Sequence, residues 1–175
     1  MTKIQGERIY LRPHEMRDKD AVLAGANEPV GAKLTGTHGT FTMAQIEGYI
    51  ERNQTEEDRY AWVICLDDDT VVGEVVINEV DRDNRSASIR IALFDSQYFG
   101  KGYGTEAMSL AVDYGFKHGD LHRIELGVYA FNPRAIHVYE KVGFKLEGTR
   151  RETLLWEGEY HDEYIMSILE TDWQK

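Results

Sequence analysis

The chain has 175 residues, of which 42% are hydrophobic and 29% are charged, and its formal net charge is −11. This length suits a single domain over residues 1–175 with one substantial core. The acidic balance argues against nucleic acid as a partner, because binding phosphates takes a basic patch. It suits a cationic substrate such as an amine, and a charge that only keeps the protein in solution would explain it equally well.

No apolar run is long enough to cross a bilayer, and the N-terminal residues MTKIQGERIYLRP lack the apolar core of a signal peptide. Cys65 is the single cysteine, so no internal disulfide can form. It lies in the apolar run YAWVICL, where we expect an inert thiol in a buried strand rather than a nucleophile. These features predict a cytoplasmic protein without a membrane partner.

The first third of the chain predicts a strand followed by helices. RIYLRP (8–13) alternates and predicts a strand, and a helix is expected over about 15–25. The segment 27–41 is rich in Gly and Thr and predicts a mobile loop. Thr42 can cap a helix that runs to about Arg52.

The middle of the chain changes to the period of strands. The runs 60–66, 70–80 and 86–94 are rich in Val and Ile and predict three consecutive strands. The residues DDD (67–69) and DRDN (81–84) predict the hairpin turns between them. An antiparallel meander is therefore expected here.

The last part predicts two helices separated by strands. A helix is expected from near Gly104, and HRIELGVY (122–129) predicts the next strand. Asn132 can cap a helix that begins at Pro133 and ends at Gly143. Two hairpin strands, TLLW and EYIMSIL, close the chain. The fold class predicted is α+β, with a mostly antiparallel sheet of about seven strands flanked by about four helices.

Three glycines stand at alternate positions in QYFGKGYGTEA: Gly100, Gly102 and Gly104. The stretch supplies neither the P-loop pattern nor the dinucleotide fingerprint, which would need glycine at Thr105. A tight glycine loop before a helix N-terminus forms an anion site suited to a pyrophosphate, to which Lys101 could add charge. A turn needed only for close packing explains the glycines equally well.

The downstream motif NPRAIHVYEKVGF (132–144), taken with GKGYGTEA, decides between these interpretations. Together they resemble the GNAT superfamily, the acyl-CoA-dependent N-acetyltransferases. The branch that is most similar contains ribosomal-protein-alanine and spermidine (diamine) acetyltransferases. The resemblance covers nearly the whole chain and implies a GNAT fold with acetyl-CoA as co-substrate.

The resemblance implies where the cofactor binds. The family's glycine loop fits either from Gln97 or from Phe99, and we prefer Phe99 because the helix start fixes where the amides point. The implied pyrophosphate site comprises Phe99, Gly100, Lys101, Gly102, Tyr103, Gly104 and Thr105. Ala92, Leu93 and Phe94 are expected to hydrogen-bond the pantetheine arm at a place where the sheet splays apart. Asn132 is expected both to cap its helix and to meet this arm.

The resemblance also implies the chemistry, a direct attack of an amine on the thioester in a ternary complex. Tyr139 matches the general acid of the family, and a phenol with a reference pKa of about 10 can protonate a departing thiolate. A tyrosine packed in the core beside Ala135 and Ile136 is the alternative. A non-catalytic module that binds CoA is the alternative at the level of function.

The base is less obvious. Many relatives carry a glutamate where this chain has Ser88, and the neighbouring Arg90 is also unusual. Glu74 and Glu79 are candidates, although a solvated strand glutamate would explain each of them. Since the six histidines are scattered, no metal site is expected.

The acceptor is expected to be a polyamine, another small amine or a protein N-terminus. The loop 27–41 is expected to line its site, with Glu28 and His38 as polar candidates. A homodimer is also possible, with Trp156, Tyr160 and Trp173 as aromatic residues that could contribute.

Overall fold

The computed structural model describes residues 2–173, and its eight strands form one sheet in the order β1-β2-β3-β4-β5-β6-β8-β7. The strands are β1 (Ile4–Gln5), β2 (Ile9–Pro13), β3 (Tyr60–Leu66), β4 (Val71–Asp81), β5 (Ser86–Leu93), β6 (Arg123–Tyr129), β7 (Lys145–Trp156) and β8 (Glu159–Leu169). Neighbouring strands pair antiparallel except β5 and β6, which are parallel. The mostly antiparallel mixed sheet predicted from the sequence is confirmed.

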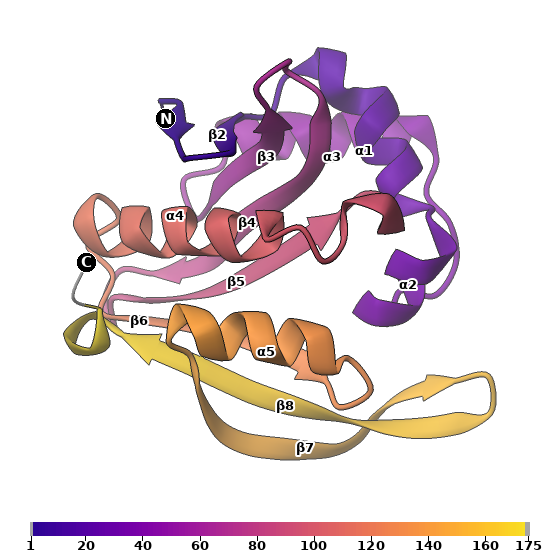
Figure 1. Cartoon of the computed structure of the whole chain (residues 1–175), viewed down its shortest axis with the longest axis vertical. Helices are drawn as coiled ribbons and strands as arrows, with labels where there is room; N and C mark the ends of the chain where they lie inside the picture. Colours follow the sequence, from indigo (N-terminus) through magenta and orange to yellow (C-terminus); the bar gives the residue numbers. More distant parts are fainter. Residues whose placement is uncertain (1, 174–175) are drawn as a thin grey trace.

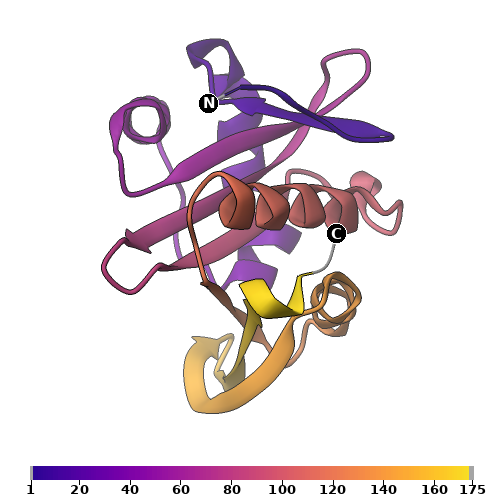
Figure 2. The ribbon, with the colours of Figure 1, turned by 90° about the vertical axis from the view of Figure 1, so that its left-hand side faces the viewer.

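Five α-helices flank the sheet, and they divide between its two faces (Figures 1 and 2). They are α1 (Lys19–Ala26), α2 (Pro29–Thr35), α3 (Met43–Thr55), α4 (Tyr103–Lys117) and α5 (Pro133–Val142). One cluster of buried side chains joins the sheet to α4 and α5, and it contains Ile77, Met108 and Val142. A second joins Phe94 to Val22 of α1 and Ile50 of α3. We call these the α4/α5 face and the α1/α3 face.

Local signals account for several element boundaries. Thr42 forms a capping box with Gln45 at the start of α3, as its position predicted. Asn132 accepts a hydrogen bond from the amide of Ala135 at 3.2 Å and caps α5, and Gly143 follows its last residue. These predicted boundaries are therefore confirmed.

Three predictions need correction. The segment 27–41 is not a continuous loop, because it contains α2, whose N-cap is Glu28 and whose C-cap is Gly36. The strand β7 begins at Lys145, well before the predicted TLLW, because pairing with β8 holds its polar first half in the sheet. Of the three aromatic residues proposed for a dimer, only Tyr160 is largely exposed, since Trp156 stacks on His38 and Trp173 packs against Phe116.

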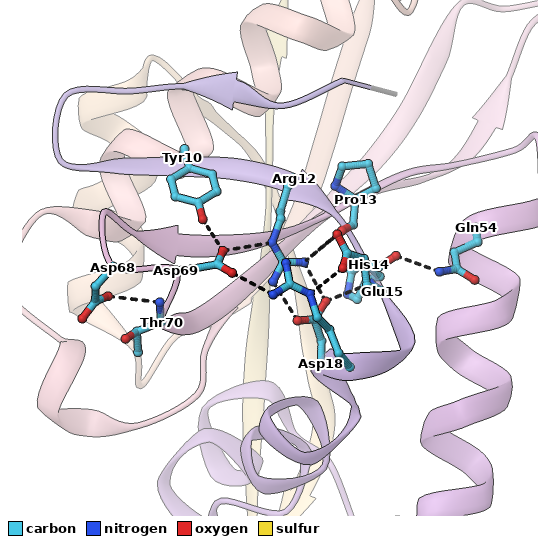
Figure 3. A network of polar contacts seen from close by, with 11 residues as sticks. Tyr10, Arg12, Pro13, His14, Glu15, Asp18, Gln54, Asp68, Asp69 and Thr70 are labelled. Atoms are coloured by element: carbon cyan, nitrogen blue, oxygen red, sulfur yellow. Dashed lines mark hydrogen bonds and ion pairs between the residues drawn. The ribbon is translucent and has the colours of Figure 1, made fainter.

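A network of charged side chains ties the start of the chain to the β3–β4 turn (Figure 3). Arg12 makes a bidentate pair with Asp18, with both nitrogen–oxygen distances at 2.8 Å. Asp69 accepts hydrogen bonds from Tyr10, Arg12 and Arg17. We call Tyr10, Arg12, Arg17, Asp18 and Asp69 the Arg12 cluster. All of its charges are paired within the cluster or with its immediate neighbours.

No helix within residues 2–173 is both long enough and apolar enough to span a membrane.

Candidate functional site

The neighbouring strands β5 and β6 separate after a short paired stretch. The parallel ladder between β5 and β6 joins only 86–88 to 123–125. Beyond it, Ile89 to Leu93 and Gly127 to Tyr129 line a gap and not a ladder. Backbone groups at such a gap need partners from another molecule or from water. The predicted separation of these strands is thus present in the fold.

The glycine stretch turns the chain from β5 into α4. Gly100 and Gly102 have φ angles of 71° and 83°, a left-handed conformation that glycine adopts without steric cost. A Cβ atom on Gly102 would also lie 2.4 Å from the Arg8 guanidinium. Gly104 is helical, lines the cavity described below, and faces open space where a Cβ would be. The first two glycines therefore serve the turn, and the third keeps the helix start accessible.

The helix α4 begins at Tyr103, one residue before its predicted start, and Gly102 is its N-cap. The first amides of an α-helix have no acceptor within the helix and attract anions. Gln97 lies in the preceding 3-10 turn Ser96–Tyr98, away from these amides. This geometry favours the loop register that starts at Phe99.

Two arginines lie beside this turn, and sequence reasoning identified neither. One of them, Arg8, also pairs with Glu106 of α4 at 3.5 Å. Arg8 donates a hydrogen bond of 2.5 Å to the carbonyl of Lys101. Arg134, in the first turn of α5, places its guanidinium 3.9 Å from the centre of the Phe99 ring. The Phe99 ring thus holds an arginine at the edge of the site.

Tyr139 and Asn132 reach the gap from α5. Both side chains are largely buried and both line the cavity. Burial raises the pKa of Tyr139 to about 12. Its hydroxyl makes no hydrogen bond within the described part of the chain. Tyr139 therefore keeps its proton at neutral pH and can donate it to a bound molecule.

A cavity of about 1000 Å³ joins the gap to the space under α1, α2 and α3. Of the residues proposed from the sequence, it brings together Glu74, Ala92, Leu93, Phe94, Phe99, Gly104, Asn132 and Tyr139. The remaining proposed cofactor residues, Gly100, Lys101, Gly102, Tyr103 and Thr105, form the adjoining turn and helix start without lining the cavity. A cavity of this size can hold a cofactor arm and a small acceptor side by side.

Glu74 lies on the cavity wall and is not a solvated strand glutamate. Only 6% of the residue is exposed. Its carboxylate accepts hydrogen bonds from His14 Nε2 at 2.8 Å, from the Tyr49 hydroxyl at 3.0 Å and from Arg90 at 3.2 Å. Burial alone would raise the pKa of this carboxyl, but the His14 hydrogen bond and the Arg90 charge outweigh it and lower the pKa. Glu74 is thus ionised and engaged by three partners.

Arg90 and Arg52 flank the ring of Tyr49 on the same wall. Their guanidinium carbons lie 5.4 Å and 5.9 Å from the centre of that ring. Arg90 also donates a hydrogen bond to the Tyr49 hydroxyl. We call His14, Tyr49, Arg52, Glu74 and Arg90 the Arg90 cluster. The β4–β5 register places Glu74 and Arg90 on the same face of the sheet. This is the α1/α3 face, because Tyr49 of α3 hydrogen-bonds both of them.

Across the gap, β8 contributes Glu163. A Cβ atom on Gly127 would lie 2.6 Å from the Glu163 carboxylate, so the missing side chain leaves room for it. Arg150 pairs with Glu163 at 3.3 Å, and the Glu163 side chain is 19% exposed. Glu163 therefore lines the cavity with a carboxylate from the strand on the far side of the gap, and Arg150 pairs with it there.

Three of the proposed acceptor residues lie outside the cavity. Glu28 uses its carboxylate to cap α2, accepting from the amides of Val30 and Gly31. His38 stacks on Trp156 with 5.0 Å between ring centres. Glu79 is exposed on β4 and accepts a hydrogen bond from Ser88. None of the three approaches the gap between β5 and β6.

Sequence reasoning missed Tyr49, Arg52, Tyr129 and Glu163, which all line the cavity. The helix period placed Tyr49 and Arg52 on α3 but could not show which side faced the sheet. In the last strand, alternation alone gave no reason to choose Glu163. Among residues 2–173, no group of three or more His, Cys, Asp or Glu side chains could hold a metal ion.

Comparison with known proteins bears on this site. A family model described as an acetyltransferase (GNAT) domain matches residues 8–145. The chain is 30% identical to the probable N-acetyltransferase YjcK of Bacillus subtilis, over 97% of this chain and 98% of that protein. It is 35% identical to the spermidine N(1)-acetyltransferase of Escherichia coli K12, over 93% of this chain and 86% of that protein.

A solved structure of an N-acetyltransferase is also similar to this chain. The spermidine N-acetyltransferase of Vibrio cholerae, in complex with CoA and spermine, superposes with a TM-score of 0.89 at 26% identity. The superposition covers 95% of this chain and 98% of that one. The similarity therefore extends over nearly the whole length of both chains.

Proposed function

The chain belongs to the GNAT acetyltransferases and is an acetyl-CoA-dependent N-acetyltransferase, and from this premise we propose that residues 1–175 form one such domain that acetylates a primary amine. The single observation that carries the proposal is the gap between β5 and β6, bordered by the amides of α4 and by the Tyr139 hydroxyl. A polyamine, another small amine and a protein N-terminus are the acceptor classes to compare. Relatives named spermidine acetyltransferases support the polyamine.

The residues around the gap fit a CoA thioester. The amides at the start of α4 suit the pyrophosphate, with Arg8 and Lys101 beside them. The unpaired edge of Ala92 to Phe94 suits the amides of the pantetheine arm. When bound, acetyl-CoA supplies the acetyl carbon that the amine attacks.

Tyr139 is the proposed general acid. As the new C–N bond forms and the C–S bond breaks, the Tyr139 hydroxyl donates its proton to the sulfur. The raised pKa keeps the phenol protonated at neutral pH, and it also makes the phenol a weaker acid than free tyrosine. Glu163 faces the gap and can take the proton that the acceptor ammonium must lose before it attacks.

An acceptor screen tests the proposal, with the release of free CoA thiol as the readout. Spermidine, amino acids, N-terminal peptides of ribosomal proteins and aminoglycosides are each supplied with acetyl-CoA. We expect thiol release above the control without acceptor for at least one amine. If every amine gives only the background rate while CoA still raises the melting temperature, the chain is a CoA-binding module and not an enzyme.

A ligand comparison tests the cofactor separately. We expect CoA to raise the melting temperature more than ATP at equal concentration, because the gap offers a partner to the pantetheine arm. An equal shift with both ligands would point to a nucleotide site of another kind. The cytoplasmic location and the assembly of two copies stay predictions from the sequence.

A further inference from the structure

The cavity wall is more positive than the protein around it. The whole chain has a net charge of −11, yet the charged residues that line the cavity are three arginines and two glutamates. The arginines are Arg52, Arg90 and Arg134. Arg134 lies over Phe99 at the cofactor end, so Arg52 and Arg90 belong to the part under α3. This part is where an acceptor can reach the gap.

Arg90 is held in place with donors to spare. It gives one hydrogen bond to Glu74 and one to the Tyr49 hydroxyl. A guanidinium has five N–H donors, so these two contacts leave three. The side chain is 45% exposed although its carboxylate partner is only 8% exposed. The buried partners therefore fix the arginine, and its free edge faces the cavity.

Arg52 adds a second positive charge. Within the described residues, its side chain makes no ion pair and no hydrogen bond, and its guanidinium approaches the Tyr49 ring. The Glu74 carboxylate does not serve it, because His14, Tyr49 and Arg90 already occupy its oxygens. Two guanidinium groups beside one ring make a site for an anionic group, since arginine binds carboxylate and phosphate through paired N–H donors.

The opposite side of the gap carries a carboxylate, Glu163, which lines the cavity and pairs with Arg150 outside it. Glu163 lies on β8, which is separated from β5 by β6 in the sheet order. A molecule that spans the cavity meets a carboxylate near the gap and two arginines beyond it. This arrangement suits an acceptor with an ammonium group at one end and an anionic group at the other. A polyamine, which is positive along its length, would bring cationic groups toward Arg52 and Arg90.

We propose that the acceptor is an amine that also carries an anionic group, a carboxylate or a phosphate, which Arg90 and Arg52 bind while Glu163 faces its amino group. The inference rests on the proposed function and names the substrate class for that site. Arg90 is the specificity-determining residue. Glu74 and Tyr49 position it, and neither touches the acceptor's reacting nitrogen.

Paired acceptors test this inference directly. Leucine is compared with 3-methylbutylamine, phenylalanine with phenethylamine, and O-phosphoethanolamine with ethanolamine, each pair differing in the anionic group. The kcat/KM for CoA thiol release is measured for each, with spermidine as a further acceptor. We expect at least one anionic member to exceed its partner and spermidine. If the preferred acceptor is an amino acid, the site binds a carboxylate. If it is O-phosphoethanolamine, the site binds a phosphate.

The two members of a pair differ in amine basicity as well as charge, so the decisive quantity is the change in their ratio on mutation. Arg90→Gln keeps hydrogen-bonding capacity toward Glu74 and Tyr49 but removes the charge. It should lower the preference for the anionic member about tenfold, which corresponds to one charge-assisted hydrogen bond. Arg52→Gln should lower it about two- to fivefold, because the side chain is exposed.

A matched control is Arg151→Gln on β7, which loses the same charge from an exposed position outside the cavity. It should leave the ratio unchanged. Retained CoA binding by each variant, read from its thermal shift, shows that the fold is intact. Arg52→Gln removes no hydrogen bond in the described structure, so it tests the inference even if Arg90→Gln fails to fold.

The outcomes separate the two levels of the proposal. If neutral amines or spermidine turn over best, and Arg52→Gln and Arg90→Gln leave every ratio unchanged, the anionic acceptor is wrong while the acetyltransferase stands. If no amine of any charge releases CoA, the proposed function itself fails and the acceptor class with it.

Discussion

The Arg12 cluster and the Arg90 cluster use the same kinds of side chains for different ends. Each combines arginine, a carboxylate and a tyrosine, and the two meet at the end of β2, where Arg12 is followed two residues later by His14. In the Arg12 cluster, Arg12 makes a bidentate pair with buried Asp18, and further donors go to Asp69 and to the carbonyl of Pro13. In the Arg90 cluster, the carboxylate is fully engaged while the arginines keep free donors toward a cavity.

The difference shows how a structural cluster can be told from a binding site. A buried charge costs free energy unless it is paired, so a cluster whose donors and acceptors all match has no capacity left for a ligand. A cluster that fixes a charged group with buried partners and leaves part of it open is preorganised for binding. Tyr139, a buried phenol whose hydroxyl has no partner in the described structure, belongs with the second kind.

The largest expected effect is on kcat, and it comes from Tyr139, whose hydroxyl is open to a ligand. Tyr139→Phe removes the proposed proton donor and little else, because the hydroxyl makes no hydrogen bond in residues 2–173. We expect kcat to fall by about 10²- to 10⁴-fold, the usual contribution of a general acid. CoA affinity and melting temperature should stay close to those of the wild type. An unchanged kcat would mean that Tyr139 is only a core tyrosine.

A substitution in the Arg12 cluster, whose charges are all paired, should change stability and not catalysis. Asp18→Ala leaves the buried Arg12 guanidinium without its bidentate partner. Breaking a buried pair in this way costs about 3–5 kcal/mol of unfolding free energy. We expect that loss in urea unfolding, with kcat/KM of the folded fraction unchanged. Asp83→Ala, on the exposed β4–β5 turn, is the control and should change stability by less than about 0.5 kcal/mol.

Acid should weaken the Arg12 cluster through the same carboxylate. Burial alone would raise the pKa of Asp18, but the hydrogen bonds from Arg12 and from the Glu15 amide outweigh it and lower the pKa. A carboxyl with a lowered folded pKa stabilises the protein above its unfolded value, about 3.9, and this contribution is lost as the pH falls through the folded pKa. Below pH 4, the urea midpoint should therefore fall less steeply for Asp18→Asn than for the wild type. Parallel curves would exclude Asp18 as a source of acid sensitivity.

The parts of the fold that sequence predicted well are those fixed by neighbours in the chain. The strands β3, β4 and β5 follow from runs of Val and Ile between turn residues, and the caps Thr42 and Asn132 act within three residues of themselves. The helix α2 was missed although Glu28, Pro29 and Gly36 cap and bound it. The Gly and Thr content of that segment outweighed these weaker signals.

The parts that sequence could not predict depend on distant partners. Glu74 reads as a surface residue until His14, Tyr49 and Arg90 converge on it from 60, 25 and 16 positions away. The polar first half of β7 is a strand only because β8 pairs with it. By contrast, Asn132 and Tyr139 both line the cavity as the motif implied, since one short helix carries both.

A smaller effect, on KM, is expected from Glu74, the buried carboxylate of the Arg90 cluster. Glu74→Gln keeps the shape of the side chain but weakens its hold on Arg90. We expect the KM of an anionic acceptor to rise about three- to tenfold with kcat little changed, the cost of one weakened charged hydrogen bond. A residue that positions Arg90 should raise KM in this way, whereas a catalytic base would lower kcat. A fall in kcat of a hundredfold or more would reassign Glu74 as the base.

The smallest effect is expected from the other glutamate on the same strand. Glu79 is exposed, has a φ of 53° at an irregularity in the β4–β5 pairing, and contacts only Ser88 among the described residues. Glu79→Gln removes the same charge as Glu74→Gln but leaves the cavity wall intact, so kcat and KM should change by less than about twofold. Steady-state kinetics of the two variants, side by side, test whether burial and partners, and not residue type, decide which carboxylate matters. If Glu79→Gln loses most of its kcat while Glu74→Gln keeps it, the proton is removed from the amine at the exposed end of β4, and the acceptor does not lie against the Arg90 cluster.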